Sequence, residues 1–463
     1  MNTETLFGSI ADDSSTKDSM RITVIGAGEV GRAIAATLSD LHKVIIIERD
    51  QRIVEELTYA HDVLAVHGDG REIKTLQQAR IEQADLVIAC TDDDEVNAVI
   101  CGTAKLVSDA FTIARVRHRT LYETWDGHPD AFGVDYMICT NLLTSEAIFR
   151  ISGLPSAREV DTFANGLVRM AAFEIGPDSP IIERAVHEID SDNSLTFAAI
   201  FRDEELLIPS GETVIQPDDH IVVIGSTQSV ENFASVISRS LRSQTDDIII
   251  AGATKVGIQT AKLFEEHGYN PRLVEQNSEK TREVAEALPN TTVLHGDPTE
   301  MSFLNREKMG EADLMIPALE HDEQNLLVTL VARQLGVDET VAVVENLEYT
   351  GLFETVGVDV TVNPREETAE EIVRFTRLNP TENIVMLEHN RAEVIEVEVA
   401  QDSTLTDRKI ANSITDLPDG VVIGAIARDD ELVTPRGSTI IKSEDHIILF
   451  VDANILDEVT EAI

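Results

Sequence analysis

Residues 22–38 read ITVIGAGEVGRAIAATL, and this stretch decides the fold. A short apolar run at 22–25 leads into three glycines with the spacing G-x-G-x-x-G, and a helical pattern follows. A buried strand, a tight turn and a helix in this order are typical of folds that bind a dinucleotide. Such a protein uses its nucleotide as a redox reagent or only senses it, and the rest of the chain has to decide between the two.

The second half of the chain repeats the first half. Residues 248–264, IIIAGATKVGIQTAKLF, start a second strand, turn and helix, with Gly252 placed 226 residues after Gly26. Other matching pairs are HGD at 67–69 and 295–297, DEVN at 94–97 with DEQN at 322–325, and PSGETVIQPDDHI at 209–221 with PRGSTIIKSEDHI at 435–447. These pairs keep their order and nearly the same offset, which indicates a tandem duplication of a long two-part unit.

Each unit reads as an α/β domain followed by a smaller module. Short, almost wholly apolar runs alternate with amphipathic stretches of helical period, and such strands are typical of a parallel sheet covered on both faces. We expect a Rossmann-like doubly wound sheet of six strands and then a small α+β module. The predicted segments are a disordered tail at 1–19, nucleotide-binding domains at 20–140 and 246–365, and smaller domains at 157–241 and 382–463.

The charge of the chain is strongly negative. It has 84 Asp and Glu against 37 Lys and Arg, a net charge of −47. Such a field repels nucleic acid and anionic lipid, so we expect neither as a direct partner. Because the acids are spread over helix faces and loops, they favour a protein from a cytoplasm at molar salt, as in salt-in halophiles, over one with a single acidic interaction surface.

Cysteine usage and hydropathy indicate a reducing cytoplasm. Cys90, Cys101 and Cys139 form no C-x-x-C pair, which argues against disulfides and against a zinc site. No apolar stretch approaches 18 residues, so we expect no membrane insertion. The N-terminus lacks the basic region of a signal peptide, so we also expect no export.

The first glycine-rich turn carries the residues expected to bind a nucleotide. Gly26 permits the tight turn, Gly28 lets the backbone approach a pyrophosphate, and Gly31 lets helix and strand pack closely. The N-terminus of the helix adds N–H donors and a partial positive charge. Glu48 ends the second predicted strand, where a carboxylate accepts hydrogen bonds from ribose hydroxyls and disfavours the extra phosphate of NADPH.

Further candidate residues follow the later strands of the first unit. Asp69, after the third strand, is placed to meet an adenine edge or to cap its own loop. Thr91 and Asp92 follow the fourth strand, at the edge where such sheets bind ligands, and Asp94 is expected to cap the next helix. Arg115 ends the fifth strand and is placed to meet a phosphate or to pair with the acidic loop.

The second unit departs from this pattern. Thr254 replaces the middle glycine, and Leu319 and Val343 are the counterparts of Thr91 and Arg115. The residues that it keeps are Gly252, Gly257, Glu275 and Asp297. We expect the second site to bind more weakly, to bind something else, or to have lost its ligand.

Residues for catalysis or metal binding are not evident in the sequence. A dehydrogenase pairs its cofactor with a general acid or base, yet His220 and His446 stand in a repeated Asp-His pair before a strand, which indicates a turn. His61 and His67 have no plausible partners as metal ligands, and neither a nucleophile elbow nor a Walker loop occurs. We therefore expect no enzyme activity.

Together these motifs resemble the TrkA family, the cytosolic regulatory subunits of Trk potassium-uptake systems, which belong to the wider RCK or KTN class. The resemblance covers the chain after residue 20 and implies two pairs of RCK N-type and C-type domains. It rests on VIGAGEVG, IIIERD, VHGDG, LVIACTDDDEVN and IARVR in the first half, on their weaker copies in the second half, and on the two P-x-G-x-T-x-I segments.

The resemblance also implies a ligand, a partner and a site. The ligand is NAD(H) or ATP/ADP, and the partner is a Trk-type potassium-transporting membrane subunit on whose cytosolic face the protein docks. The family further implies a homo-oligomer with a ring of RCK modules. The residues implied are Gly26, Ala27, Gly28, Glu29, Val30, Glu48, Thr91, Asp92 and Arg115 for the first site, and Gly252, Ala253, Thr254, Lys255, Val256 and Glu275 for the second.

Two other functions stay open on the sequence. An NAD-dependent oxidoreductase with two Rossmann domains would need a polar catalytic set facing the nicotinamide, and no such set is evident. A nucleotide-sensing scaffold for another partner would share every feature described above. The sequence therefore favours sensing over redox chemistry.

Overall fold

The computed structural model of the protein describes the chain from residue 19 onward, with short gaps. The described ranges are 19–39, 42–60, 63–128, 131–152, 154, 157–177, 179–190, 194–202, 205–237, 247–377, 384–387, 391–401, 403–413, 417–418, 420–429, 431–456 and 458–459. All but the last residue of the predicted tail therefore lies outside the described residues, as does most of the linker between the two halves.

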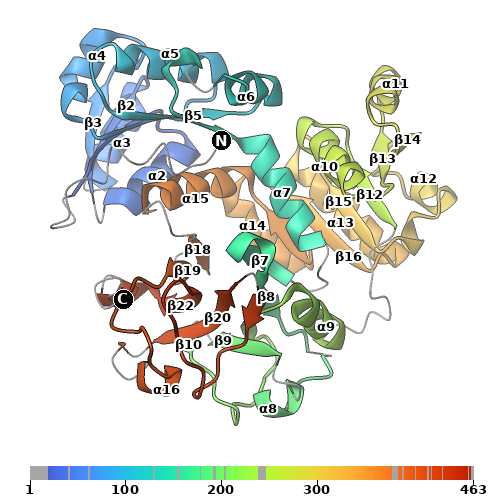
Figure 1. The fold of residues 1–463 in the computed structure, drawn as a ribbon. Coiled ribbons are helices and arrows are strands. Elements are labelled where there is room, and N and C mark those ends of the chain that lie inside the picture. Colours follow the sequence, from blue (N-terminus) through green and yellow to red (C-terminus); the bar gives the residue numbers. More distant parts are fainter. Residues whose placement is uncertain are drawn as a thin grey trace.

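The first half begins with a parallel sheet flanked by helices (Figure 1). Its strands are β1 (Arg21–Ile25), β2 (Lys43–Glu48), β3 (Leu64–His67), β4 (Leu86–Ala89), β5 (Phe111–Val116) and β6 (Tyr136–Cys139). The elements between them are α2 (Glu29–Ser39), α3 (Gln51–Ala60), α4 (Ile73–Gln78), η1 (Ile81–Gln83), α5 (Asp94–Lys105), α6 (Arg119–Asp126) and η2 (Ala131–Gly133). The strand order β3-β2-β1-β4-β5-β6 confirms the doubly wound fold. We call these elements the first N-module.

The second half repeats this sheet, and we call the repeat the second N-module. Its strands are β12 (Ile248–Ala251), β13 (Arg272–Glu275), β14 (Thr292–His295), β15 (Leu314–Pro317), β16 (Glu339–Val343) and β17 (Val360–Val362), in the order β14-β13-β12-β15-β16-β17. The elements between them are α10 (Lys255–Glu266), α11 (Ser278–Ala287), α12 (Met301–Arg306), η4 (Met309–Glu311), α13 (Asp322–Leu335) and α14 (Leu347–Val356). All residues of β4, β12 and β15 are buried, which explains why these strands read as unbroken apolar runs.

A small antiparallel sheet, which we call a C-module, follows each N-module. The first contains β7 (Ala157–Phe163), η3 (Ala164–Gly166), β8 (Val168–Glu174), α8 (Val186–Ile189), β9 (Leu195–Arg202), β10 (Glu205–Leu207), β11 (His220–Gly225) and α9 (Thr227–Ile237). The second contains β18 (Ile384–Leu387), β19 (Ala392–Glu398), α16 (Ile410–Ser413), β20 (Val421–Arg428), β21 (Glu431–Val433), β22 (His446–Asp452) and η6 (Ala453–Ile455). Equivalent strands have the same neighbours in both sheets, so both parts of the unit are duplicated.

The repeated Asp-His pair starts the last strand of each C-module. Asp219 is fully buried and accepts hydrogen bonds from Nε and Nη2 of Arg202 at 2.7 and 2.8 Å. Asp445 accepts the same pair of bonds from Arg428, both at 2.6 Å. A buried carboxylate held by two guanidinium N–H groups fixes the turn before the strand. The interpretation of this motif as a turn is therefore confirmed.

Two long helices are exchanged between the halves. Helix α7 (Thr140–Ser152) leaves the first N-module and packs on α10 of the second, whereas α15 (Pro364–Arg377) leaves the second N-module and packs on α2 of the first (Figure 1). Ile148 of α7 is buried in the core of the second N-module, and Ile372 of α15 in that of the first. Phe375 also stacks on Tyr136 of the first sheet, with ring centroids 4.6 Å apart. The segments that the sequence marks only as domain boundaries thus supply core helices.

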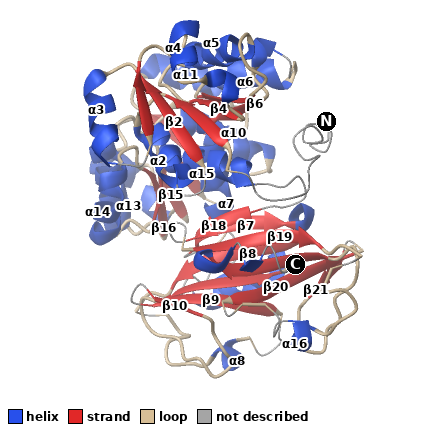
Figure 2. Ribbon diagram, turned by 90° about the vertical axis from the view of Figure 1, so that its left-hand side faces the viewer, coloured by secondary structure: helices blue, strands red, loops and turns tan. Residues whose placement is uncertain are grey.

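The two small sheets pack face to face below the N-modules (Figure 2). Phe163 and Ile224 of the first sheet share one core with Val394 and Phe450 of the second. A Cβ added at Gly424 would lie 2.4 Å from Cδ1 of Ile224, so the absence of a side chain at this glycine lets the two sheets approach closely. Through these contacts and the exchanged helices, the two halves form one pseudo-symmetric pair.

Candidate nucleotide-binding site

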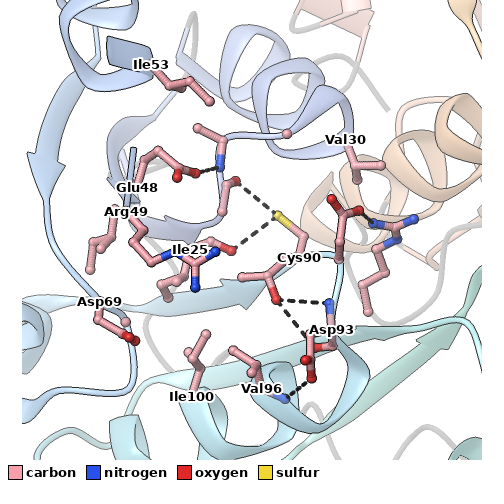
Figure 3. A pocket seen from close by; sticks show the side chains of 18 of the residues that line it. Ile25, Val30, Glu48, Arg49, Ile53, Asp69, Cys90, Asp93, Val96 and Ile100 are labelled. Carbon is pink, nitrogen blue, oxygen red and sulfur yellow. Dashed lines mark hydrogen bonds and ion pairs between the residues drawn. The ribbon is translucent and has the colours of Figure 1, made fainter. Parts of the chain in front are cut away.

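A cavity of about 720 Å³ opens at the carboxyl ends of β1 and β4, where the sheet changes its winding direction (Figure 3). Its volume lies within the range of small-molecule sites, about 300–1,000 Å³. Ile53, Val96 and Ile100 give it apolar walls. Ten of the predicted site residues line it: Gly26, Ala27, Gly28, Glu29, Val30, Glu48, Asp69, Thr91, Asp92 and Arg115. The structure thus brings residues from five separate segments to one place.

The three glycines of the first turn have different reasons to be glycine. Gly26 has a φ of +104°, and a Cβ there would lie 3.0 Å from the backbone N of Thr91. A Cβ at Gly31 would lie 1.9 Å from the carbonyl oxygen of Gly26, so this glycine lets α2 pack onto the turn behind the cavity. At Gly28 a Cβ would meet nothing within 4 Å. Packing does not explain Gly28, but the space it leaves in front of the α2 N-terminus suits a phosphate.

Glu48 ties the turn to the second strand. Its Oε2 accepts a hydrogen bond from the N–H of Ala27 at 2.7 Å (Figure 3). Its Oε1 accepts one from the N–H of Asp50 at 2.8 Å. A carboxylate has about four acceptor positions, so two remain for the hydroxyls of a ribose. Glu48 is therefore a preorganised acceptor at the position that the sequence predicts for it.

Cys90 lies beneath the turn and directly follows β4. Its thiol is placed to donate to the carbonyl oxygens of Ile25 and Gly26, with Sγ–O distances of 3.6 and 3.5 Å. Burial raises the pKa of Cys90 to about 12, so the thiol stays uncharged. Cys90, Cys101 and Cys139 are all buried and free. Their burial indicates a packing role.

The loop between β4 and α5 is built around two of its polar side chains. The backbone N and Oγ1 of Thr91 both donate to Oδ1 of Asn97, at 2.9 and 2.6 Å. Asp93 is the N-cap of α5 and accepts a hydrogen bond from the N–H of Val96 at 2.9 Å. The prediction that Asp94 caps α5 is wrong, because Asp94 is buried and accepts hydrogen bonds from backbone N–H groups of the loop after β5. Because the backbone of Asp93 is extended, the Asp93 carboxylate lies within reach of the free N–H groups at the start of α5.

Five arginines and five carboxylates line the cavity, so its formal charge is balanced although the chain as a whole is strongly acidic. Arg115 is only 4% exposed, and its Nε donates to Oγ1 of Thr140 at 3.1 Å. Burial lowers the pKa of Arg115, while its Nη1 lies 3.7 Å from Oδ1 of Asp92. Asp92 also pairs with Arg117. The arginines that line the cavity are Arg32, Arg49, Arg71, Arg115 and Arg365.

Asp69 is a paired anion at the rim of the cavity. Nε of Arg71 donates to its two carboxylate oxygens at 3.0 and 3.2 Å. These bonds from Arg71 lower the pKa of Asp69 to about 2. Its Oδ1 also accepts the backbone N–H of Arg71 at 2.9 Å, so Asp69 caps its own loop, the second of the two roles considered for it. A contact with an adenine edge would have to use an acceptor position that Arg71 leaves open.

Among the cavity residues that the sequence did not indicate, Arg365 comes from the other half of the chain. It belongs to α15 and reaches the cavity only because that helix packs on the first N-module. It pairs with Glu29 of the glycine-rich turn. Nothing in the local segment VNPREE marks it as a ligand-binding residue, since the contact depends on the exchange of helices.

The second glycine-rich turn keeps the hydrogen bonds that organise the first turn, but one of its own side chains extends across the region in front of the helix. Glu275 repeats the role of Glu48 and accepts bonds from the N–H groups of Ala253 and Asn277 at 3.1 and 2.7 Å. Thr254 caps α10, and its hydroxyl donates to the carbonyl oxygen of Ala318 at 2.6 Å. This bond spans from the turn to the end of β15, across the edge where the first half has its cavity.

The remaining predicted residues of the second half make structural contacts. Leu319 packs against Gly252, where an added Cβ would lie 2.9 Å from its Cδ2. A Cβ at Gly257 would lie 2.1 Å from the carbonyl oxygen of Gly252. Asp297 caps its own loop through Thr299, and Lys255 contacts the ring of His118 in the first half. Val256 and Val343 are buried in the core of the second N-module.

Two doubly wound modules, each opened by a glycine-rich turn and followed by a small antiparallel sheet, define a duplicated protein of the nucleotide-binding fold. The TrkA-N domain family matches residues 22–139 and 248–364, and the TrkA-C domain family matches residues 170–238 and 394–463. These matches cover well over half of the chain. The chain belongs to the TrkA family, which confirms the predicted resemblance.

Individual relatives agree with this assignment. The chain is 34% identical to Trk system potassium uptake protein TrkA homolog 1 of Methanosarcina mazei, over 95% of this chain and 99% of the relative. It is 33% identical to the TrkA homolog of Archaeoglobus fulgidus, over 96% and 99%. The crystal structure of the GsuK RCK domain shares the fold with a TM-score of 0.58 at 18% identity, over 97% and 96% of the two chains. The GsuK channel bound to NAD has a TM-score of 0.59 at 18% identity, over 97% and 79%.

Proposed function

We propose that this chain is the regulatory subunit of a Trk-type potassium uptake system and that it binds NAD(H) or ATP/ADP in the first N-module. The observation that carries the proposal is the cavity at the switch point of that module, where Gly28 leaves open space before a helix N-terminus. Five arginines balance the five carboxylates of this cavity in a chain of net charge −47, so guanidinium groups are at hand to pair with an anionic ligand. The relatives are named as potassium uptake proteins, and one structure of the same fold is described as bound to NAD.

The cavity supports sensing of the nucleotide rather than its chemistry. Its polar groups are backbone N–H groups, carboxylates and guanidinium groups, which bind and orient an anion. A ligand regulates when it binds two conformations with different affinity. Because α15 follows the last strand of the second N-module, packs on the first and places Arg365 in the cavity, a bound nucleotide bears directly on how the halves pack.

Contact with the membrane is assigned to a partner. In the part of the chain that the structure describes, no helix is long and apolar enough to cross a bilayer. The partner would be a Trk-type potassium-transporting subunit, with this protein lying peripherally on its cytoplasmic face as a homo-oligomeric ring of RCK modules. Within the chain we place the N-type domains at 20–140 and 246–365 and the C-type domains at 157–241 and 382–463.

The second site is proposed to bind nucleotide weakly or not at all. Thr254 spans the region between the turn and β15, and Leu319 packs on Gly252. The halves share their cores, so the two sites are best compared in the intact chain. Titration calorimetry in molar KCl should give one nucleotide per chain, and two sites of equal affinity would contradict the proposed asymmetry.

Potassium flux through liposomes that contain the membrane subunit tests the function. Flux should depend on this protein and on ATP, ADP or NADH, and Gly28→Asp should abolish the nucleotide dependence, because a carboxylate there repels and displaces the pyrophosphate. Gly176→Asp is the matched control, since it adds the same charge at an exposed glycine with equally open surroundings far from the cavity. Flux that ignores the protein would refute the proposal, and stoichiometric oxidation of NADH would replace it with an oxidoreductase.

A further inference from the structure

Arg365 comes from the second half of the chain but lines the cavity of the first N-module. It is the second residue of α15, and its backbone N–H donates to Oδ1 of Asn363 at 2.9 Å, which fixes the start of the helix. Further along the same helix, Ile372 and Val373 are buried in the core of the first N-module. The guanidinium is therefore presented from a helix that is held at its start and along its length.

Two carboxylates from different halves hold Arg365. Its Nη1 pairs with Oε2 of Glu29, the first residue of α2. Its Nε lies 3.6 Å from Oε2 of Glu345, which closely follows β16 in the second N-module. The side chain of Glu29 is 47% exposed, so it is free to turn toward solvent. Arg365 thus links the glycine-rich turn of one half to the sheet edge of the other.

A phosphate bound at the first turn would compete with Glu29 for this guanidinium. Helix N-termini bind phosphates, and Gly28 leaves the space for one beside Glu29. A terminal phosphate carries up to two negative charges against one for a carboxylate, and it accepts two parallel hydrogen bonds from a guanidinium. The carboxylate of Glu29 therefore occupies a position beside Arg365 that a terminal phosphate of a nucleotide can take with more negative charge.

We infer that Arg365 recognises the terminal phosphate of a nucleoside di- or triphosphate bound in the first N-module and releases Glu29 when it does so. This inference rests on the proposed function, which places a nucleotide in the same cavity. In a dinucleotide both phosphates are esterified on either side, so neither ends in a dianion. Arg365 consequently favours ADP and ATP over NAD(H), and the bound phosphate joins the first turn to α15 and, through Glu345, to the second N-module.

Titration calorimetry of the intact chain in molar KCl, with ATP, AMP and NAD as separate ligands, tests the inference. Arg365→Gln should weaken ATP binding about 10- to 100-fold, the usual effect of losing hydrogen bonds to a charged group. AMP, which ends at the glycine turn, should lose less than about threefold. Arg306→Gln removes a distant surface arginine of the second half and is the matched charge control.

Glu29→Gln separates the exchange of partners from a general charge effect. It should strengthen ATP binding in the wild-type background, because Arg365 no longer has to leave a carboxylate, and the gain should be largely lost in the Arg365→Gln background. Equal gains in both backgrounds would overturn the exchange, and so would an Arg365→Gln chain with an unchanged ratio of ATP to AMP affinity. If Arg365→Gln fails to fold, Arg365→Lys should keep the charge and show a smaller loss of ATP affinity. A wild-type chain that binds none of the ligands would refute the proposed nucleotide site itself.

Discussion

Ile372→Ala should destabilise the first N-module, although the residue belongs in sequence to the second half. Ile372 is fully buried among residues of β1, β4 and α2. The change removes three carbon atoms, about 2.4 kcal/mol of transfer free energy at about 0.8 kcal/mol each. The cavity left behind adds to this, so the expected cost is about 2–5 kcal/mol. The loss of stability falls on the first N-module, because α15 completes the core of that module.

Hydrogen exchange read by mass spectrometry is the suitable assay, because a chain of this size need not unfold in one step. Peptides from α2 and β1 should lose protection by at least about 25-fold, the equivalent of about 2 kcal/mol. Leu352→Ala, at a half-exposed leucine of α14, is the control and should cost less than about 0.5 kcal/mol. Faster exchange confined to the second N-module would refute the exchanged packing.

Three further predictions concern the site, the salt and the pH. Glu48→Gln should weaken nucleotide binding in calorimetry by about 1–3 kcal/mol through loss of a charged acceptor, whereas Glu275→Gln should change it little; equal effects would contradict a single working site. Lowering KCl from 1 M to 0.1 M lengthens the Debye length from about 3 to about 10 Å, so the charge of −47 should lower the melting temperature seen by circular dichroism; a melting temperature independent of KCl would refute the halophilic interpretation. Burial raises the pKa of Glu367 from 4.5 to about 7, so this group stabilises the fold below pH 4.5 and that stability is lost as the pH rises through 7. Glu367→Gln should remove this pH dependence of the free energy of unfolding, which is on the order of 1–3 kcal/mol because 26% of the side chain is exposed to solvent. Urea titrations at pH 5 and pH 8 measure it, and a variant with the same pH dependence as the wild type would contradict the prediction.

The parts of the site that the sequence predicted are those encoded locally. Gly26, Gly28 and Glu48 lie at spacings set by one strand, one turn and one helix, so a short window contains the geometry. Asp94 was expected to be the cap in place of Asp93, because three consecutive aspartates offer the same chemistry and only the backbone angles separate them. The local sequence pattern thus identified the loop, but not which of its aspartates caps the helix.

The parts that the sequence missed depend on contacts between the halves. Arg365 lies 339 residues after Gly26, and its segment reads as an ordinary acidic helix start. Helices α7 and α15 lie in the predicted domain boundaries, and each packs its apolar face into the core of the other half. The substitution at Thr254 is visible in the sequence, but the acceptor of its hydroxyl, Ala318, is 64 residues away and only the fold brings the two together. Periodicity shows that a helix has an apolar face without showing what covers that face.

The exchange of helices sets the order in which a newly made chain can complete its cores. The first sheet ends at Cys139, but the helix that covers α2 ends only at Arg377, about 240 residues later. At roughly 5–20 residues per second, a ribosome needs on the order of 10–50 s to make that stretch. During this interval the nascent first module carries an uncovered apolar face on α2. Synthesis of this protein therefore includes an interval in which the apolar surface that α15 later covers stays exposed to solvent.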